Sequence, residues 1–178
     1  MAHFMYVAVQ GDNKISVFTI DPKSGNLTPE FEVPVAGGPF TLSISPDKGY
    51  LYVGCRETPG ISSFRIDPNG GGLTSIGAVP LNSWPVYIST DRKGKYLLSS
   101  YYQGAGVKVH GIADDGSVID PPVVSLDTAT GAHAMQTDST NSYAFVPHIA
   151  GNGPNCIYQF IFDENTGQIR PNSPHIVE

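Results

Sequence analysis

The sequence predicts an all-β protein, a β-propeller of four-stranded antiparallel blades. Two sequence motifs recur at an interval of about 46 residues, and turn-forming residues are spread along the whole chain. The 178 residues include 20 Gly and 15 Pro, and only 15% of them are charged. Many short strands joined by turns are typical of this composition, whereas long solvent-facing helices need more Lys, Glu and Arg.

The first motif is a tight turn followed by an apolar strand. Its copies are residues 45–53 (SPDKGYLYV), residues 90–98 (TDRKGKYLL) and, more weakly, residues 137–145 (TDSTNSYAF). An Asp side chain can accept backbone hydrogen bonds from the residues that follow it, and Gly or Asn tolerates positive φ. We therefore expect a turn in each copy, and the apolar run after it predicts a strand that is buried on both faces.

The second motif lies between copies of the first and ends an alternating strand in another turn. Its copies are residues 18–21 (FTID), 64–67 (FRID) and 160–163 (FIFD), and a degraded copy occupies residues 110–116 (HGIADDG). Two interleaved motifs with one period define a repeat of four antiparallel strands, which is the blade of a propeller.

The repeat divides the chain into about four blades. We place them at residues 1–36, 37–82, 83–128 and 129–178. The chain begins with residues that match the second strand of a blade, so the first blade is expected to lack its innermost strand. The aromatic residues at equivalent repeat positions, such as Tyr50, Tyr96 and Tyr143, are expected to pack between blades.

Composition and charge argue against several classes of partner. The formal net charge is −6 and the ten Lys and Arg residues form no run, which argues against nucleic-acid binding. No apolar stretch approaches the length of a membrane-spanning helix, and the N-terminus has no signal-peptide pattern. Cys55 and Cys156 lie in apolar strands, so we expect free buried thiols and a cytoplasmic protein, with a disulfide as the less favoured alternative.

The motifs resemble those of the propeller-type 6-phosphogluconolactonases and the related carboxymuconate-lactonizing enzymes. The most specific stretches are residues 45–56, Ser99-Ser100-Tyr101 and Gly131-Ala132-His133-Ala134. The resemblance implies a seven-bladed ring, of which this chain would be the N-terminal part with about four blades. It also implies hydrolysis of 6-phosphogluconolactone to 6-phosphogluconate in the pentose phosphate pathway of glucose metabolism. No metal or organic cofactor is expected.

Two other functions stay open. The chain could belong to a cycloisomerase that acts on a muconate, or it could be a non-catalytic propeller that binds a ligand or a protein. In the enzymatic cases the partner is a small anionic lactone. We also expect the open blade faces to make the protein self-associate.

His133 and His148 are the predicted catalytic residues. Lactone hydrolysis needs a base that activates water and donors that stabilise the tetrahedral oxyanion, and a histidine can serve in either role. We expect His133 to begin the innermost strand of the fourth blade, near the mouth of the central channel, and it matches a proposed catalytic His of the lactonizing enzymes. His148 is expected to end the second strand of the same blade. For His133, the structural alternative is a residue that caps a strand edge.

Arg56 and Tyr101 are predicted to bind the substrate. Arg56 follows the second strand of the second blade, where a guanidinium can hold a phosphate or carboxylate through two hydrogen bonds. Tyr101 and Tyr102 have the matching place in the third blade, and Tyr101 is the one predicted to contact the substrate. An ion pair with Glu57 or Asp67 is the structural alternative for Arg56. We expect Trp84 to pack between blades rather than to stack on a sugar.

Overall fold

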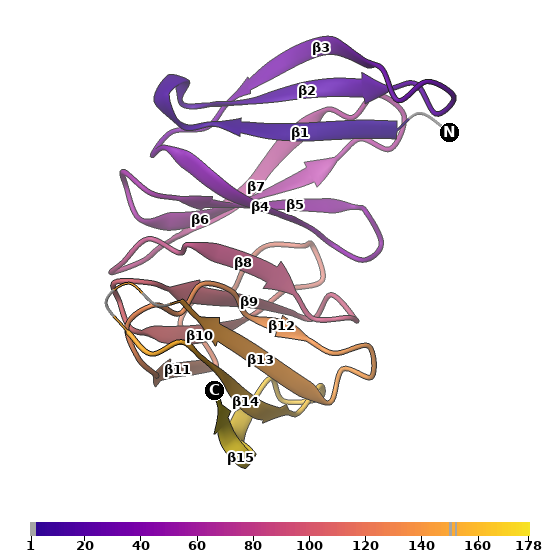
Figure 1. Ribbon diagram of the computed structural model, residues 1–178. Helices are drawn as coiled ribbons and strands as arrows, with labels where there is room; N and C mark the ends of the chain where they lie inside the picture. Colours follow the sequence, from indigo (N-terminus) through magenta and orange to yellow (C-terminus); the bar gives the residue numbers. More distant parts are fainter. Residues whose placement is uncertain (1–2, 150, 152) are drawn as a thin grey trace.

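Four antiparallel sheets are stacked one on another in the computed structural model, which describes residues 3–149, 151 and 153–178 (Figure 1). The sheets follow one another in chain order, from the indigo N-terminal sheet at the top of the view to the orange and yellow C-terminal sheet at the bottom. Over the described ranges, no helix is long and apolar enough to cross a membrane.

Each sheet is formed by strands that are consecutive in the chain. The first two sheets consist of β1 (His3–Val9), β2 (Lys14–Ile20) and β3 (Leu27–Pro34), then β4 (Pro39–Ile44), β5 (Tyr50–Cys55), β6 (Gly60–Ile66) and β7 (Leu73–Pro80). The other two consist of β8 (Tyr87–Thr90), β9 (Tyr96–Tyr101), β10 (Gly106–Gly111) and β11 (Val124–Asp127), then β12 (Gln136–Thr137), β13 (Tyr143–His148), β14 (Cys156–Phe162) and β15 (Ile169–Val177). A 3-10 turn, η1 (Gln10–Asp12), precedes β2.

The predicted fold class is confirmed. The first sheet has three strands and each of the other sheets has four. The repeated sequence motifs align β1 with β5, which is the second strand of its blade. Among the described residues, the first sheet has no counterpart of the innermost strands β4, β8 and β12.

The Asp residues of the first motif close the turn between the first and second strands of their blades. Asp47 accepts hydrogen bonds from the Gly49 amide at 3.0 Å and from the Ser45 hydroxyl. The Ser45 hydrogen bond and that of the Gly49 amide lower the pKa of the Asp47 carboxyl. Asp91 and Asp138 accept from the backbone amides four and five residues later, at distances of 2.7 to 3.0 Å. In the second blade the Ser45 hydroxyl takes this place and accepts from the Tyr50 amide at 2.9 Å. The recurring Asp is a turn residue, as its position in the motif predicts.

Separate apolar clusters fill the spaces between neighbouring blades. Between the first and second blades they are Ile15, Val17, Val35, Leu51, Val53, Cys55, Phe64 and Ile66. Between the second and third blades they are Tyr52, Ile61, Val79, Ile88, Leu97 and Val118. Between the third and fourth blades they are Leu98, Val107, Val109, Ala132, Met135, Ala144, Val146, Phe160 and Phe162. These three clusters contain most of the buried apolar residues of the described chain. Each fully buried side chain of this size stabilises a fold by roughly 1.5–3 kcal/mol, so most of the stabilisation from apolar burial comes from the stacking of the sheets.

One contact recurs at all three blade boundaries. An aromatic ring near the start of a second strand packs on a positive-φ glycine in the outermost turn of the next blade. The pairs are Phe4 with Gly71, Tyr50 with Gly116 and Tyr96 with Gly167. A Cβ atom added to any of the three glycines would overlap the ring, so the ring can come this close to the turn only where the side chain is absent.

Tyr143, the repeat tyrosine of the fourth blade, has no neighbouring blade on its side among the described sheets. This residue occupies the position of Tyr50 and Tyr96, yet 41% of its surface is exposed. It lies in the fourth blade on the face opposite the third blade, where none of the described sheets is packed.

Two glycines with the same backbone angle allow the ring contact to be measured. Gly167 and Gly25 both have φ of +72°, but Gly167 lies against Tyr96, whereas nothing in the described part of the chain lies within 4 Å of a Cβ placed on Gly25. Gly25→Ala should lower the free energy of unfolding by the backbone strain alone, roughly 1–2 kcal/mol. Gly167→Ala should lower the free energy of unfolding by about 1–3 kcal/mol more than this, because its methyl group displaces the Tyr96 ring. Urea denaturation of dilute protein measures both, and equal losses would contradict the contact.

Candidate functional site

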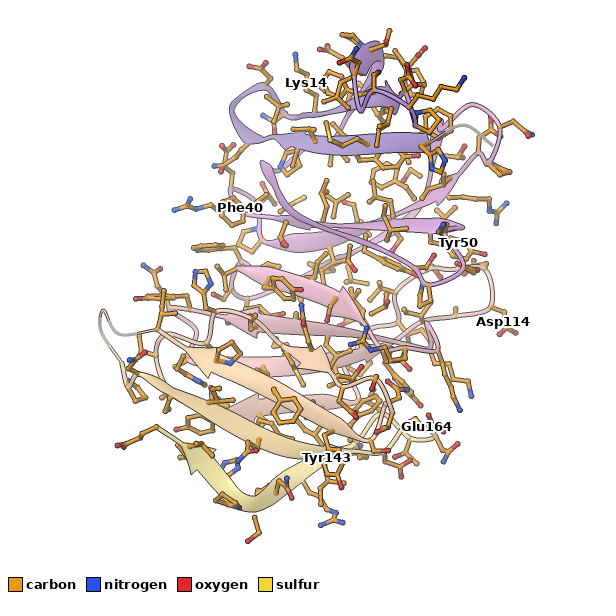
Figure 2. The ribbon with its side chains drawn as sticks, turned by 45° about the vertical axis from the view of Figure 1, so that its right-hand side comes forward. Lys14, Phe40, Tyr50, Asp114, Tyr143 and Glu164 are labelled. Atoms are coloured by element: carbon orange, nitrogen blue, oxygen red, sulfur yellow. The ribbon has the colours of Figure 1, made fainter. Side chains whose placement is uncertain are left out.

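The predicted site residues lie near one edge of the propeller, which we call the mouth edge. It is the edge at which the second strands β5, β9 and β13 end and the innermost strands begin. Register fixes this arrangement: Pro39 at the start of β4 pairs with Cys55 at the end of β5, and Ala132 pairs with His148. In Figure 2, Phe40 marks this edge at the left of the molecule, and Tyr50, Asp114 and Glu164 lie on the opposite side.

Arg56 stacks on two aromatic rings at the boundary between the second and third blades. Its guanidinium carbon lies 4.5 Å from the ring centre of Trp84 and 5.4 Å from that of Phe40. The two rings meet edge to face, with centroids 5.4 Å apart. The Arg56 backbone N–H donates to the Gly38 carbonyl at 2.9 Å, which fixes the start of this side chain. Such cation–π contacts hold a guanidinium in place without consuming its N–H donors.

The ion pair considered for Arg56 does not form. Within the described residues the ion pairs join Lys14 to Asp12 and Glu32, and Lys93 to Glu164. Arg56 is exposed, and its charge is available to a bound anion. Trp84 packs between blades as expected, and it does so against the residue predicted to bind substrate.

A second pair occupies the same place one blade further along. Tyr102 follows β9 as Arg56 follows β5, and His133 precedes β12 as Trp84 precedes β8. The rings of Tyr102 and His133 meet edge to face with centroids 6.1 Å apart. His133 is exposed, and its backbone N–H donates to the Pro147 carbonyl at 2.9 Å. The expectation that His133 begins the innermost strand is wrong by three residues, because β12 begins at Gln136.

Tyr101 does not face the mouth edge. Only 3% of its surface is exposed, and its hydroxyl lies 3.0 Å from that of Ser99. Burial raises the pKa of the Tyr101 phenol to about 12, an effect that the Ser99 hydrogen bond opposes. Of the two tyrosines expected at this place, Tyr102 corresponds to Arg56, because each of them directly follows the second strand of its blade.

His148 is also an interior residue, with 2% of its surface exposed. Its Nδ1 donates to the Val146 carbonyl at 3.0 Å, and its Nε2 therefore accepts from the Thr128 hydroxyl at 3.0 Å. The ring also packs on Tyr158, with centroids 4.4 Å apart. Burial lowers the pKa of His148, and the hydrogen bond to Val146 partly opposes this. Both nitrogens are occupied by protein groups, which favours a structural role in joining the third and fourth blades.

A hollow in the surface is lined by other residues and suits a different chemistry. A pocket of about 510 Å³ lies between the first and second blades. Its described lining includes Val35, Cys55, Phe64 and Val79 and has no charged side chain. No three His, Cys, Asp or Glu residues of the described ranges come together in a way that could hold a metal ion. The mouth edge is the better candidate for an anionic substrate, because it combines a free arginine with an exposed histidine.

Comparison with known proteins decides the family. A family model described as "Lactonase, 7-bladed beta-propeller" matches residues 2–83 and 37–177. The chain belongs to the lactonase family of seven-bladed β-propellers. The 6-phosphogluconolactonases of Pectobacterium atrosepticum and Pectobacterium carotovorum are each 37% identical to it over 147 residues, which is 83% of this chain and 43% of theirs. This lactonase-family chain therefore spans less than half the length of these curated relatives.

Solved structures show the same fold. A putative 6-phosphogluconolactonase from Bacteroides fragilis is similar over 99% of this chain and 55% of its own, with a TM-score of 0.86 and 18% identity. The periplasmic gluconolactonase of Pseudomonas aeruginosa has the same coverage, a TM-score of 0.82 and 21% identity. The fold of these lactonase-like structures thus extends over the whole of the four described blades.

The two histidines should differ in their effect on stability. His148→Ala removes two buried hydrogen bonds and the contact with Tyr158, and should lower the free energy of unfolding by about 2–3 kcal/mol. His133→Ala removes an exposed side chain and should change it by less than about 0.5 kcal/mol. Chemical denaturation checks both values. A loss at His133 as large as that at His148 would show that His133 is structural too.

Proposed function

We propose that the mouth edge binds the anionic lactone of a sugar and that this chain takes part in hydrolysing 6-phosphogluconolactone to 6-phosphogluconate in the pentose phosphate pathway. The observation that carries the proposal is the pairing of Arg56 with Trp84 at one blade boundary and of Tyr102 with His133 at the next. Both pairs lie at the same edge, and both are built from residues that a ligand can reach. The names of the Pectobacterium relatives support the choice of substrate.

Arg56 is proposed to bind the phosphate. A guanidinium can give a phosphate two parallel N–H hydrogen bonds, and stacking on Trp84 reduces the side-chain freedom that is lost on binding. The formal net charge of −6 would repel an anion at a distance, so the attraction must be local. A single stacked arginine that is free of carboxylates supplies such a local charge.

His133 is proposed to activate the water. Its imidazole would take a proton from a water molecule as the water oxygen bonds to the lactone carbonyl carbon. The tetrahedral intermediate then collapses, the bond from that carbon to the ring oxygen breaks, and the ring oxygen takes from the His133 imidazolium the proton that came from the water and becomes a hydroxyl. Tyr102, edge-on to the His133 ring, would set the orientation of the imidazole. His148 and Tyr101 remain predictions with less support, because both side chains are buried.

We further propose a cytoplasmic protein. Cys55 and Cys156 are both buried and both free thiols, which suits a reducing compartment. Burial raises the pKa of the Cys55 thiol, which keeps it protonated and unreactive.

Substrates with and without a phosphate separate the two roles. For 6-phosphogluconolactone, Arg56→Met should raise KM by about 10–100-fold, whereas the rate with unphosphorylated gluconolactone should change by less than about twofold. His133→Gln should lower kcat for both lactones by about 10²–10⁴-fold. Hydrolysis above the spontaneous rate is followed by the acid released. Arg65→Met is the matched control, since Arg65 is an exposed arginine that pairs with Tyr50, away from the mouth edge.

The same assay separates the alternatives. Unchanged kinetics in both variants would overturn the assigned roles. A folded protein that turns over carboxymuconate but neither lactone would indicate the cycloisomerase, and one that acts on none of them would favour a binding propeller.

A further inference from the structure

One position of the blade is occupied by a ring at two of the described blade boundaries and by a small side chain at the other. It is the residue that ends the second strand: Cys55 in β5, Tyr101 in β9 and His148 in β13. Each of the three pairs with the residue that begins the third strand of its blade, so their places in the sheet are the same. All three are buried, with 2–3% of their surface exposed.

A second position follows the same pattern. It lies two residues into the third strand and holds Ser62 in β6, Lys108 in β10 and Tyr158 in β14. The Lys108 ammonium lies 5.4 Å from the ring centre of Tyr101. The rings of Tyr158 and His148 have centroids 4.4 Å apart. Two large side chains therefore fill this place in the third and fourth blades, whereas the second blade has two small ones.

The pocket between the first and second blades lies where these large side chains are missing. Its lining includes both Cys55 and Ser62, and its volume is about 510 Å³. This volume falls within the range of small-molecule sites, about 300–1,000 Å³. The apolar walls consist mainly of Pro34, Val35, Phe64, Ala78 and Pro80.

The chemistry of the pocket favours a neutral ligand. Its lining has no charged side chain. Burial raises the pKa of the Cys55 thiol, and the protonated thiol lies 3.6 Å from the Ala36 carbonyl, to which it donates. The hydroxyls of Ser62 and Ser75 are the polar groups on the second-blade wall, and each can exchange a hydrogen bond with a hydroxyl of a ligand.

We propose that this pocket binds a neutral aromatic alcohol of one or two fused rings, whose rings take the place that protein side chains fill in the third and fourth blades. Tyr101, a phenol, and the stacked rings of His148 and Tyr158 show that this niche of the blade accommodates aromatic groups. The proposal does not rest on the function proposed for the mouth edge, because neither Arg56 nor His133 lines the pocket.

Two variants fill the pocket with side chains that the other blades carry. Cys55→Tyr introduces the residue of the third blade, and Ser62→Tyr introduces that of the fourth. Thr74→Tyr is the matched control, because Thr74 is an exposed residue of β7 that does not line the pocket. Arg56→Met tests whether an aromatic ligand binds instead beside Trp84.

Isothermal titration calorimetry with 2-naphthol measures the binding. We expect one molecule per chain with a dissociation constant at or below about 1 mM. The constant should rise at least about tenfold in Cys55→Tyr and Ser62→Tyr and change by less than about twofold in Thr74→Tyr and Arg56→Met. The anion 2-naphthoate should bind at least about tenfold more weakly than 2-naphthol, because the pocket offers no counter-charge. Absence of binding, or binding that the folded filled variants retain, would overturn the proposal.

A second measurement uses the unchanged protein and decides the matter if a filled variant does not fold. N-ethylmaleimide modifies the two thiols, and mass spectrometry of peptides gives the rate at each. At ten times its dissociation constant, 2-naphthol should slow the modification of Cys55 by about tenfold, since it leaves only about a tenth of the pockets open. Cys156 is the internal control, because it is buried in the fourth blade. Equal slowing at both thiols, or none at Cys55, would rule out this pocket as the site.

Discussion

Face-to-face stacking of the sheets is the interaction on which the rest of this molecule depends. No blade of three or four short strands can bury both of its faces alone, and a lone sheet of this size is marginally stable in water. The second and third blades each bury one face against the preceding blade and the other against the following blade, and the clusters between blades consist of Val, Ile, Leu and aromatic residues. The glycines in the outer turns permit this close approach, because the rings of Phe4, Tyr50 and Tyr96 lie where a Cβ atom would otherwise be.

The proposed site is a direct product of this stacking. Arg56 and Trp84 come from different blades, and so do Tyr102 and His133, so each pair exists only because two sheets are docked in register. The strand polarity brings the ends of the second strands and the starts of the innermost strands to one edge. Loops at that edge can then vary in chemistry while the apolar faces beneath them keep their packing.

The repeat made most of the fold predictable. Two interleaved motifs gave the number of blades, the strand order within a blade and the three-stranded first blade, because each motif combines a turn residue with a strand of fixed polarity. Side-chain direction was harder to predict. A strand alternates its faces with a period of two, so the one-residue difference between Tyr101 and Tyr102 exchanges an interior phenol for a surface one.

The partners of individual side chains across blade boundaries could not be predicted from the local sequence. Trp84 was expected to lie between blades, but its stacking with Phe40 and Arg56 joins residues that are far apart in the chain and could not be inferred from spacing. His148 has the repeat position of a strand end, yet only the structure shows that Val146 and Thr128 occupy both of its nitrogens. The exposure of Tyr143 depends on what its blade faces, which the repeat pattern alone does not encode.

The central claim, that the stacked Arg56 binds the anionic group of a sugar acid or its lactone, can be tested by fluorescence. Trp84 is the chain's one tryptophan, so its emission reports on this cluster alone. Titration with 6-phosphogluconate, the stable product, should change the Trp84 emission to saturation at or below about 1 mM, as expected for a metabolite site. The change should be lost in Arg56→Met and retained in Arg65→Met. An emission that 6-phosphogluconate leaves unchanged in the folded protein would contradict the assignment of the mouth edge as the substrate site.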